Sequence, residues 1–466
     1  MTKDEAREAG AISRLLRPQR VAVIGASDQA DKIGGRPIDL LLRSGFAGEI
    51  IPVNPGRAMI QGLAAYKTIA AAGGAIDAAI IAVPAESVAE ALAQCGEAGV
   101  RAAVIFSSGF AEIGERGRAE QEALVAVARQ HKLRFVGPNS IGLVNFAAGA
   151  TLSFASVLDG TVEDGEIAVI SQSGAFGIAV YSQLRERGLG VRYMCATGNQ
   201  ADLSVADFLA EIANDASQRA ALLYIEHVPG RDLLRAAIER AVAAGLCVVA
   251  VAAGLSAHGR RSAMLHTGGS GEQRITPEFL DECGAIVATD LDDLVAKADA
   301  VLAAPSGLPP RPRLVLVSNS GASCVLAADA AAELGLPLAD LAETSRARLT
   351  QALPAFSLNR NPIDLTAMLR GMPQLVPAVL DIALADANAD ALTFGLVAVG
   401  AGYDVAAYAR ACATASAHYG KPVIVYSPHS NVRTVFAAAG VPIFSSERQA
   451  LAHVQLMSRL PARRRR

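Results

Sequence analysis

Residues 21–27 read VAVIGAS, a run of four apolar residues that ends in glycine, alanine and serine. Short apolar runs return at residues 49–53, 78–83 and 102–106, and residues 86–97 have the spacing of an amphipathic helix. Fully apolar strands that alternate with helices are typical of a parallel sheet covered on both faces. We therefore predict that the chain begins with an α/β domain built on a parallel sheet.

The same alternation returns in two further blocks. The second contains EIAVIS, ALLYIE, CVVAVAAG and AIVA, which begin at residues 166, 221, 247 and 285. The third contains LVLVSNSG, ALTFGLVAVG, PVIVY and VPIF, which begin at residues 314, 391, 422 and 441. Prolines are frequent between the two blocks, at residues 305–312, as in a linker. We predict three α/β domains, at residues 1–147, 148–305 and 306–466.

The composition of the 466 residues excludes several classes of protein. Hydrophobic residues make up 52% and charged residues 19%, which is too apolar for a disordered chain. A net charge of −3 gives no basic field, so we expect no nucleic-acid partner. The run from Arg463 to Arg466 favours a solvated tail over a binding arm.

Three features of the sequence bear on where in the cell the protein is located. Residues 241–257 carry no charge, but Gly245 and Gly254 divide them, so a helix end, a glycine stop and a buried strand fit better than a membrane span. The six cysteines lie far apart, without metal-ligand spacing, and we expect them to be small buried residues. The first ten residues do not resemble a signal peptide. We expect a soluble, cytoplasmic protein without a metal site.

Ligands of parallel sheets bind beyond the carboxyl ends of the strands, which directs attention to the first glycine turn, Gly25 to Ser27. The backbone N–H groups of a following helix could hold a phosphate there, or the glycine could simply make a tight turn. The turn is not the NAD fingerprint, because Ser27 stands where GxGxxG requires glycine. Asn54 also stands near the end of the second strand, where a ribose-binding carboxylate would be expected. A phosphorylated ligand other than a nicotinamide cofactor is therefore favoured.

Four further residues of the second block could carry chemistry, and a fifth is a rival candidate. Ser173 and Gly174 follow a buried strand and open a helix, which suits an anion, although Ser173 could equally be an ordinary N-cap. His266 lies on a glycine-rich stretch, LHTGGSG, that we expect to be a mobile loop, where it could react or be an ordinary loop histidine. Glu226 ends an apolar strand and could orient an imidazole for nucleophilic attack. His227, next to Glu226, is the rival candidate to His266 for the reacting histidine.

Taken together, these motifs resemble the NDP-forming acyl-CoA synthetases, namely the ADP-forming acetyl-CoA synthetases and, more distantly, the succinyl-CoA ligase alpha subunit. The matching text includes VAVIGAS, GFAGEIIPVNP, AAIIAVPAESV and FVGPNSIGLVN in the first block and GEIAVISQSGAFG, ATGNQADLSVADFL and LHTGG in the second. In the third it includes RLVLVSNSGASCVLAADAAAELGL and NRNPIDLT. The resemblance implies a Rossmann-like coenzyme A-binding domain followed by two flavodoxin-like ligase domains.

The resemblance also implies roles for individual residues. It implies a coenzyme A site formed by strand-end residues of the first domain: Gly25, Ser27, Lys32, Asn54, Arg57, Pro84, Ser107, Ser108, Gly109 and Asn139. The family's phosphorylatable histidine falls on His266 and its supporting glutamate on Glu226, while Ser173 and Gly174 fall where the family holds the phosphoryl group. The chain departs from the family where His227 replaces the usual glycine after that glutamate.

The activity that the resemblance implies is the reversible conversion of a carboxylic acid, coenzyme A and ATP into acyl-CoA, ADP and phosphate, through an acyl phosphate and a phosphohistidine. No stretch of the chain looks like the ATP-grasp unit that binds ATP or ADP and Mg²⁺ in this family. We therefore expect an alpha-type subunit with an ATP-grasp beta subunit as partner, in a homo- or hetero-oligomer. The alternative is a catalytically silent, coenzyme A-binding regulatory protein.

Overall fold

The computed structural model describes residues 3–159, 164–267, 274–303, 308–353 and 359–460, and for residues 3–9, 264–267, 303 and 367 it describes the backbone alone. The glycines after His266 and the terminal arginines lie outside the described residues. Contacts within the chain divide it into two compact units, and the first of them ends in the sequence at Ala303. The domain limits expected at residues 147 and 305 stay a prediction.

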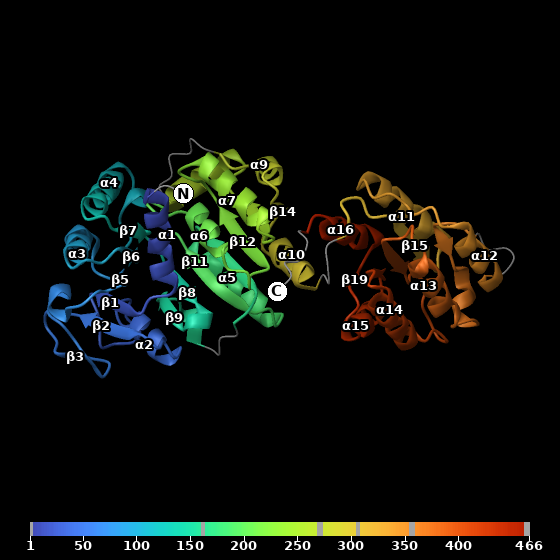
Figure 1. Ribbon diagram of the computed structural model, residues 1–466, viewed down its shortest axis with the longest axis horizontal. Coiled ribbons are helices and arrows are strands. Elements are labelled where there is room, and N and C mark those ends of the chain that lie inside the picture. The colour runs from blue at the N-terminus through green and yellow to red at the C-terminus, as the bar shows by residue number, and fades with distance from the viewer. Residues whose placement is uncertain (1–2, 160–163, 268–273, 304–307, 354–358, 461–466) are drawn as a thin grey trace. The chain divides into compact units, whose positions relative to one another are not determined.

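The first sheet of the amino-terminal unit has five parallel strands in the order β2-β1-β5-β6-β7 (Figure 1). Alternate residues of β1 enter different cores: Val21 and Val23 pack with α1 and α2, whereas Ala22 and Ile24 pack with α3 and α4. The predicted parallel sheet with two covered faces is thus confirmed. Its elements are α1 (Lys3–Leu16), β1 (Arg20–Ile24), α2 (Arg36–Arg43), β2 (Glu49–Val53), the β3 (Met59–Ile60) and β4 (Leu63–Ala64) hairpin, η1 (Ile69–Ala72), β5 (Ala78–Ile81), α3 (Ala85–Glu97), β6 (Ala102–Ile105), η2 (Ala111–Ile113), α4 (Glu115–Gln130) and β7 (Arg134–Val136).

The second sheet has the order β14-β13-β12-β10-β11-β8-β9, with five parallel strands and an antiparallel hairpin at one edge (Figure 1). The hairpin, which the sequence did not reveal, pairs with β11 although its first strand lies within residues 1–147. The elements are β8 (Gly142–Asn145), η3 (Phe146–Ala148), β9 (Ala150–Ser153), η4 (Ser156–Asp159), β10 (Ile167–Ser171), α5 (Gly174–Glu186), β11 (Val191–Ala196), α6 (Val205–Ile212), β12 (Ala220–Ile225), α7 (Arg231–Ala243), β13 (Cys247–Ala252), α8 (Ala257–Thr267), α9 (Pro277–Glu282), β14 (Ile286–Ala288) and α10 (Leu291–Ala303).

The uncharged stretch at residues 241–257 contains the end of α7, a left-handed turn at Gly245 and the buried strand β13, as predicted. Among the described residues, no helix is both long and apolar enough to cross a membrane. All six cysteines are buried, which confirms their expected place in the cores.

The carboxyl-terminal unit holds a third sheet, parallel throughout, in the order β16-β15-β17-β18-β19. Helices pack on both of its faces and form two separate cores. Its elements are β15 (Leu314–Ser318), α11 (Gly321–Glu333), α12 (Glu343–Ala352), β16 (Ile363–Asp364), η5 (Thr366–Arg370), α13 (Leu375–Ala385), β17 (Ala391–Gly395), α14 (Val405–Tyr419), β18 (Val423–Tyr426), α15 (Ser430–Ala438), β19 (Ile443–Phe444) and α16 (Glu447–Ser458).

The loop at residues 197–203 fastens the two sheets of the amino-terminal unit to each other. Its backbone N–H groups donate to β7 and the turn beyond it, from Asn199 to Pro138 (3.0 Å), from Ala201 to Gly137 (3.0 Å) and from Leu203 to Phe135 (3.0 Å). The carboxylate of Asp202 adds an ion pair with Arg134 (2.9 Å). Because these bonds join the carboxyl end of β7 to the loop after β11, the carboxyl edges of the two sheets lie next to each other at this point.

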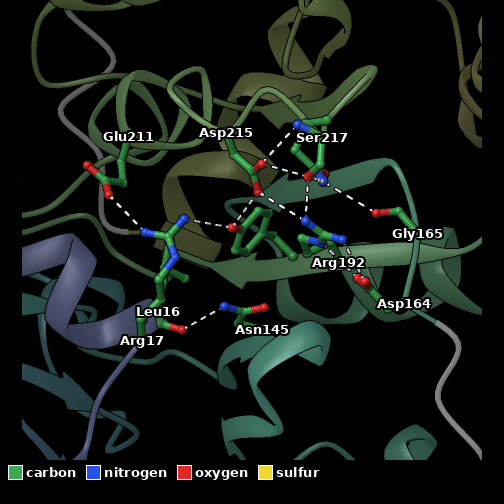
Figure 2. A network of polar contacts seen from close by, with 11 residues as sticks. Leu16, Arg17, Asn145, Asp164, Gly165, Arg192, Glu211, Asp215 and Ser217 are labelled. Carbon is green, nitrogen blue, oxygen red and sulfur yellow. Dashed lines mark hydrogen bonds and ion pairs between the residues drawn. The ribbon is translucent and has the colours of Figure 1, made fainter. Parts of the chain in front are cut away.

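A polar network links the opposite, amino-terminal edges of the sheets (Figure 2). Arg17, between α1 and β1, donates to the hydroxyl of Tyr193 (2.9 Å), which donates to Asp215 (2.8 Å). Beside them Arg192 pairs with Asp164 (2.6 Å), and residues of this network line a hollow of 540 Å³. Since both arginines are paired with acidic or phenolic groups, we interpret the network as a structural link.

Candidate active site

The turn after β1 is held by contacts that only glycine allows. Gly25 has φ +84°, and a Cβ there would lie 2.4 Å from the carbonyl oxygen of Ala82. Asn54 directly follows the neighbouring strand β2 and links it to this turn. Its side-chain amide donates to the Ala26 carbonyl (2.8 Å) and accepts from Gly56 N–H (2.8 Å). Gly25, Ser27 and Asn54 are therefore brought together at the carboxyl edge of the first sheet.

A residue that sequence reasoning missed completes this turn. Gln61 has a left-handed backbone (φ +48°), and its amide donates to the carbonyl oxygens of Ser27 (3.0 Å) and Gly35 (2.9 Å). Its own N–H donates to Asp28 (2.8 Å). No local signal marks Gln61, because its partners lie more than 25 residues away in the chain.

The two cations expected at this edge lie on its surface. Lys32 and Arg57 are both exposed, and Arg57 lies 3.7 Å from the carboxylate of Asp28. Arg36, which could also offset phosphate charge, pairs with Asp39 instead (3.1 Å). Exposed cations beside a glycine turn fit a phosphorylated ligand, because their positive charges can offset the negative charge of the phosphate oxygens.

The later strand-end loops of the first sheet lie side by side. Pro84 occupies the N-cap position of α3. Ser107 donates from Oγ to the Val83 carbonyl (2.5 Å), and its own carbonyl accepts from Asn139 N–H (2.8 Å). Ser108 is exposed. These contacts bring Pro84, Ser107, Ser108 and Asn139 to one edge.

Glu112 bridges that edge to the second sheet. One carboxylate oxygen accepts from Gly109 N–H (2.6 Å) and the other from the side-chain amide of Asn199 (2.6 Å). Asn199 is buried, contacts Gln121 (3.0 Å) and accepts from the Asn139 amide (3.3 Å). Sequence reasoning missed Asn199 as a site residue, although it lies in the quoted ATGNQ motif.

The loop after β10 carries the expected helix N-terminus. Ser173 is the N-cap of α5 and accepts from Phe176 N–H (3.3 Å), so the ordinary capping role is real. A Cβ on Gly174 would lie 2.7 Å from the side chain of Ile141, so a larger residue there would force that side chain to move. The N-terminus of a 13-residue helix still favours an anion, because its backbone dipoles add to a partial positive charge.

Glu226 directly follows β12, which ends one residue earlier than predicted, at Ile225. Its carboxylate accepts a hydrogen bond from the Tyr224 hydroxyl (3.1 Å). The Tyr224 ring stacks on Phe176 in the first turn of α5, with ring centroids 4.2 Å apart. Burial, reinforced by the nearby carboxylate, raises the pKa of Tyr224, so its hydroxyl remains a donor. This contact holds Glu226 on the side of the sheet where α5 begins.

His266 was expected on a loop, but its backbone lies in the last turn of α8. The segment before it, AHGRRSAML, has one glycine and no proline, and its alanine, arginine, methionine and leucine favour helix. The side chain of His266 lies outside the described part of the chain, so the pairing of His266 with Glu226 stays a prediction. Helix α8 packs against η2, which carries Glu112, so the helix of His266 lies next to the loop of Ser107 to Gly109.

No group of three or more histidine, cysteine, aspartate or glutamate side chains in the described ranges could hold a metal ion. The thiol of Cys95 is buried, and this burial raises its pKa to about 12, which makes it unreactive. The described part of the site offers the carboxylate of Glu226, the backbone N–H groups at the start of α5 and the exposed cations Lys32 and Arg57.

Comparison with known proteins agrees with this arrangement. Residues 19–145 match a family of CoA binding domains, and residues 164–301 match the succinyl-CoA ligase like flavodoxin domain. The alpha subunit of the ADP-forming acetate–CoA ligase II of Pyrococcus furiosus is 34% identical over 380 residues, which cover 81% of this chain and 80% of that subunit. The chain belongs to the ADP-forming acyl-CoA ligases.

Members of this family differ in length. The alpha subunit of ligase I from the same organism is 35% identical, with 77% of this chain and 78% of that subunit covered. The ADP-forming 4-hydroxybutyrate–CoA ligase of Nitrosopumilus maritimus is 30% identical, but the match covers 76% of this chain and only 50% of that protein. The chain thus spans most of the alpha subunits and about half of the longer ligases.

A solved structure covers nearly the whole chain. The dinucleotide-forming acetyl-coenzyme A synthetase 1 of Ca. Korarchaeum cryptofilum, in complex with phosphate and ADP, shares 27% identity and has a TM-score of 0.82, with 97% of each chain covered. The predicted fold class was a Rossmann-like coenzyme A-binding domain followed by two flavodoxin-like ligase domains. These matches bear it out and show a coenzyme A-binding domain followed by a succinyl-CoA ligase-type flavodoxin domain.

Proposed function

We propose that the chain acts as the alpha subunit of an ADP-forming acyl-CoA synthetase and that His266 carries the phosphoryl group between two sites. The observation that supports this most is the packing of α8 on η2, beside the loop of Ser107 to Gly109. That loop belongs to the residues that we assign to coenzyme A. A histidine at the end of such a helix can receive a phosphoryl group where the thioester is formed or cleaved.

The proposed coenzyme A site consists of Gly25, Ser27, Lys32, Asn54, Arg57, Pro84, Ser107, Ser108, Gly109 and Asn139. The glycine turn leaves no room for a side chain, and Lys32 and Arg57 are exposed, so the residues present fit a ligand with several phosphates. The match of residues 19–145 to CoA binding domains supports the same ligand.

The reaction proceeds in three balanced steps. An oxygen of inorganic phosphate attacks the thioester carbonyl, the carbon–sulfur bond breaks, and coenzyme A leaves as acyl phosphate forms. A ring nitrogen of His266 then attacks phosphorus and displaces the carboxylate product. ADP finally takes the phosphoryl group from the histidine to give ATP, and acyl-CoA synthesis is the reverse of this sequence.

The chain's own residues have distinct tasks in these steps. The N-terminus of α5, at Ser173 and Gly174, stabilises the phosphoryl oxygens through backbone N–H groups and the helix dipole. The carboxylate of Glu226 accepts a hydrogen bond from the imidazole N–H of His266. This bond fixes the tautomer of the ring and stabilises the positive charge that develops on it.

The nucleotide half belongs to a partner in this proposal. We propose an ATP-grasp beta subunit that binds ATP or ADP and Mg²⁺. The longer ligases, of which the chain covers about half, support a second half of similar size. The buried free thiols also support a reducing, cytoplasmic environment.

The test uses the chain mixed with its candidate ATP-grasp partner, Mg²⁺ and ATP labelled at the γ-phosphate. We expect an acid-labile, base-stable label on the wild-type chain and none on His266→Ala. Equal label on both proteins would refute the role of His266. Absence of label on the wild type, together with stabilisation by coenzyme A, would favour the silent coenzyme A-binding protein instead.

A further inference from the structure

Gln172 lies between the two serines of the phosphate-binding loop and is buried, with 2% of its surface exposed. Its side-chain oxygen Oε1 accepts two backbone hydrogen bonds, from the N–H of Glu226 and from the N–H of His227 (3.0 Å). Its own N–H donates to the Tyr224 carbonyl (3.2 Å). Both of these backbone groups can only donate, so the side-chain atom that faces them must be the amide oxygen. The orientation of the Gln172 amide is therefore settled.

The nitrogen of the same amide determines which nitrogen of the His227 ring carries the proton. Gln172 Nε2 lies 3.2 Å from Nδ1 of His227. An amide NH₂ group can only donate, so Nδ1 of His227 must accept and the neutral imidazole carries its proton on Nε2. Burial, assisted by the positive charge of Arg118, lowers the pKa of His227 and favours this neutral ring.

We propose that Gln172 is a positioning residue that acts in two ways on Glu226 and His227, the two residues that follow β12. It fixes the backbone of Glu226, and hence its carboxylate, relative to the helix N-terminus at Ser173. It also holds His227 as the Nε2–H tautomer, in which neither ring nitrogen offers a lone pair for attack on phosphorus. This inference rests on the proposed function and adds to it the reason why the phosphoryl group goes to His266 and not to His227.

The tautomer can be measured directly in the complete wild-type chain by ¹⁵N NMR of its imidazole groups, with His227 assigned by its loss in His227→Gln. We expect an unprotonated Nδ1 that accepts a hydrogen bond and a protonated Nε2. A proton on Nδ1 of His227 would overturn the inference. This readout does not depend on activity, so it still decides the matter if the phosphohistidine mechanism fails.

The variant Gln172→Glu tests the consequence for catalysis. The carboxylate can still accept both backbone hydrogen bonds but cannot donate to Nδ1, so the proton of His227 moves to Nδ1 or the ring becomes charged. We expect a shifted pH profile and a fall in kcat of about tenfold, because His227 no longer keeps its proton on Nε2 and a new carboxylate lies beside the phosphate-binding loop. An unchanged pH profile and kcat would contradict the proposal.

Gln200→Glu is a matched control, since the side-chain amide of Gln200 donates to the backbone carbonyl of His227 (3.1 Å) and not to Nδ1 of its ring, which accepts from Gln172. It should leave the His227 tautomer unchanged, and a tautomer shift of the same size in this control would also contradict the proposal. Should Gln172→Glu fail to fold, His227→Gln serves instead. It should keep the full amount of label on His266, and loss of that label would show that His227 takes part in phosphoryl transfer.

Discussion

Tyr224 and Glu226 lie on the same side of the end of β12, where the tyrosine hydroxyl reaches the carboxylate (3.1 Å) and the tyrosine ring rests on Phe176 of α5. A phenol with a raised pKa keeps its proton at neutral pH, so the Tyr224 hydroxyl remains a donor to the carboxylate. Tyr224 thereby holds Glu226 toward the helix N-terminus. The sequence places Glu226 at a strand end but contains no local sign of the contact with Phe176.

Tyr224→Phe removes the hydroxyl and leaves the ring stack in place. We expect kcat to fall about tenfold, because Glu226 loses the hydrogen bond that orients it, while the free energy of unfolding changes by only about 1 kcal/mol. Steady-state kinetics and chemical denaturation check the two values. Phe176→Leu is the converse control, since it weakens the stack but keeps the hydroxyl. A tenfold loss in this control alone would contradict the role given to the hydroxyl.

At the scale of elements, the carboxyl ends of the strands are predictable and the long-range contacts between them are not. The turn at Gly25 and the cap at Ser173 have local causes, a positive φ and a helix start, so their sequence patterns suffice. Gln61 and Asn199 contact residues remote in the chain, and only the folded topology brings these together. His266 was predicted on a loop because the glycines after it outweighed the helix-forming residues before it.

Gly25→Ala tests how closely the turn after β1 must approach β5. A Cβ there meets the Ala82 carbonyl at 2.4 Å, so we expect destabilisation of about 2–3 kcal/mol and weaker coenzyme A binding. Chemical denaturation and isothermal titration with coenzyme A check the two effects. Gly62→Ala is a matched control, since Gly62 has a similar φ (+79°) with nothing within 4 Å. Equal losses in both variants would mean that backbone conformation alone explains the effect.

At the scale of the whole molecule, the sequence patterns were sufficient to predict three parallel sheets and not their edges. The hairpin of β8 and β9 adds two antiparallel strands to the second sheet. The sequence did not predict this hairpin, because its short strands contain no long apolar run. The network of Arg17, Tyr193 and Asp215 further joins the two sheets of the amino-terminal unit. Its members come from three separate segments of the chain, so the sequence gives no local sign of it. The carboxyl-terminal unit has cores of its own and one buried histidine, His453 on α16.

His453 should make the carboxyl-terminal unit sensitive to acid. Burial lowers the pKa of His453 to about 4, whereas an unfolded chain protonates a histidine near its ordinary pKa of about 6.5. The unfolded state therefore binds the extra proton as the pH falls below about 6.5, and stability declines until the pH reaches about 4. The full loss is about 3 kcal/mol.

His453→Leu should remove this pH dependence and keep the contact with Phe444, whose ring lies 4.9 Å from that of His453. Thermal unfolding at pH 7 and pH 5 measures the effect. The exposed His418 provides a control, since His418→Gln should leave the difference between the two pH values as it is in the wild type. A difference that persists unchanged in His453→Leu would show that another group is responsible.

The central claim is that His266 receives a phosphoryl group at the edge where coenzyme A binds. Its most direct measurement incubates the chain with acetyl-CoA and ³²P-labelled inorganic phosphate, without nucleotide, and maps the label by mass spectrometry. The account predicts acid-labile label on His266, absent from His266→Ala and absent when acetyl-CoA is replaced by free coenzyme A. Label on a different residue, or none with any acyl-CoA in the presence of the partner, would contradict it.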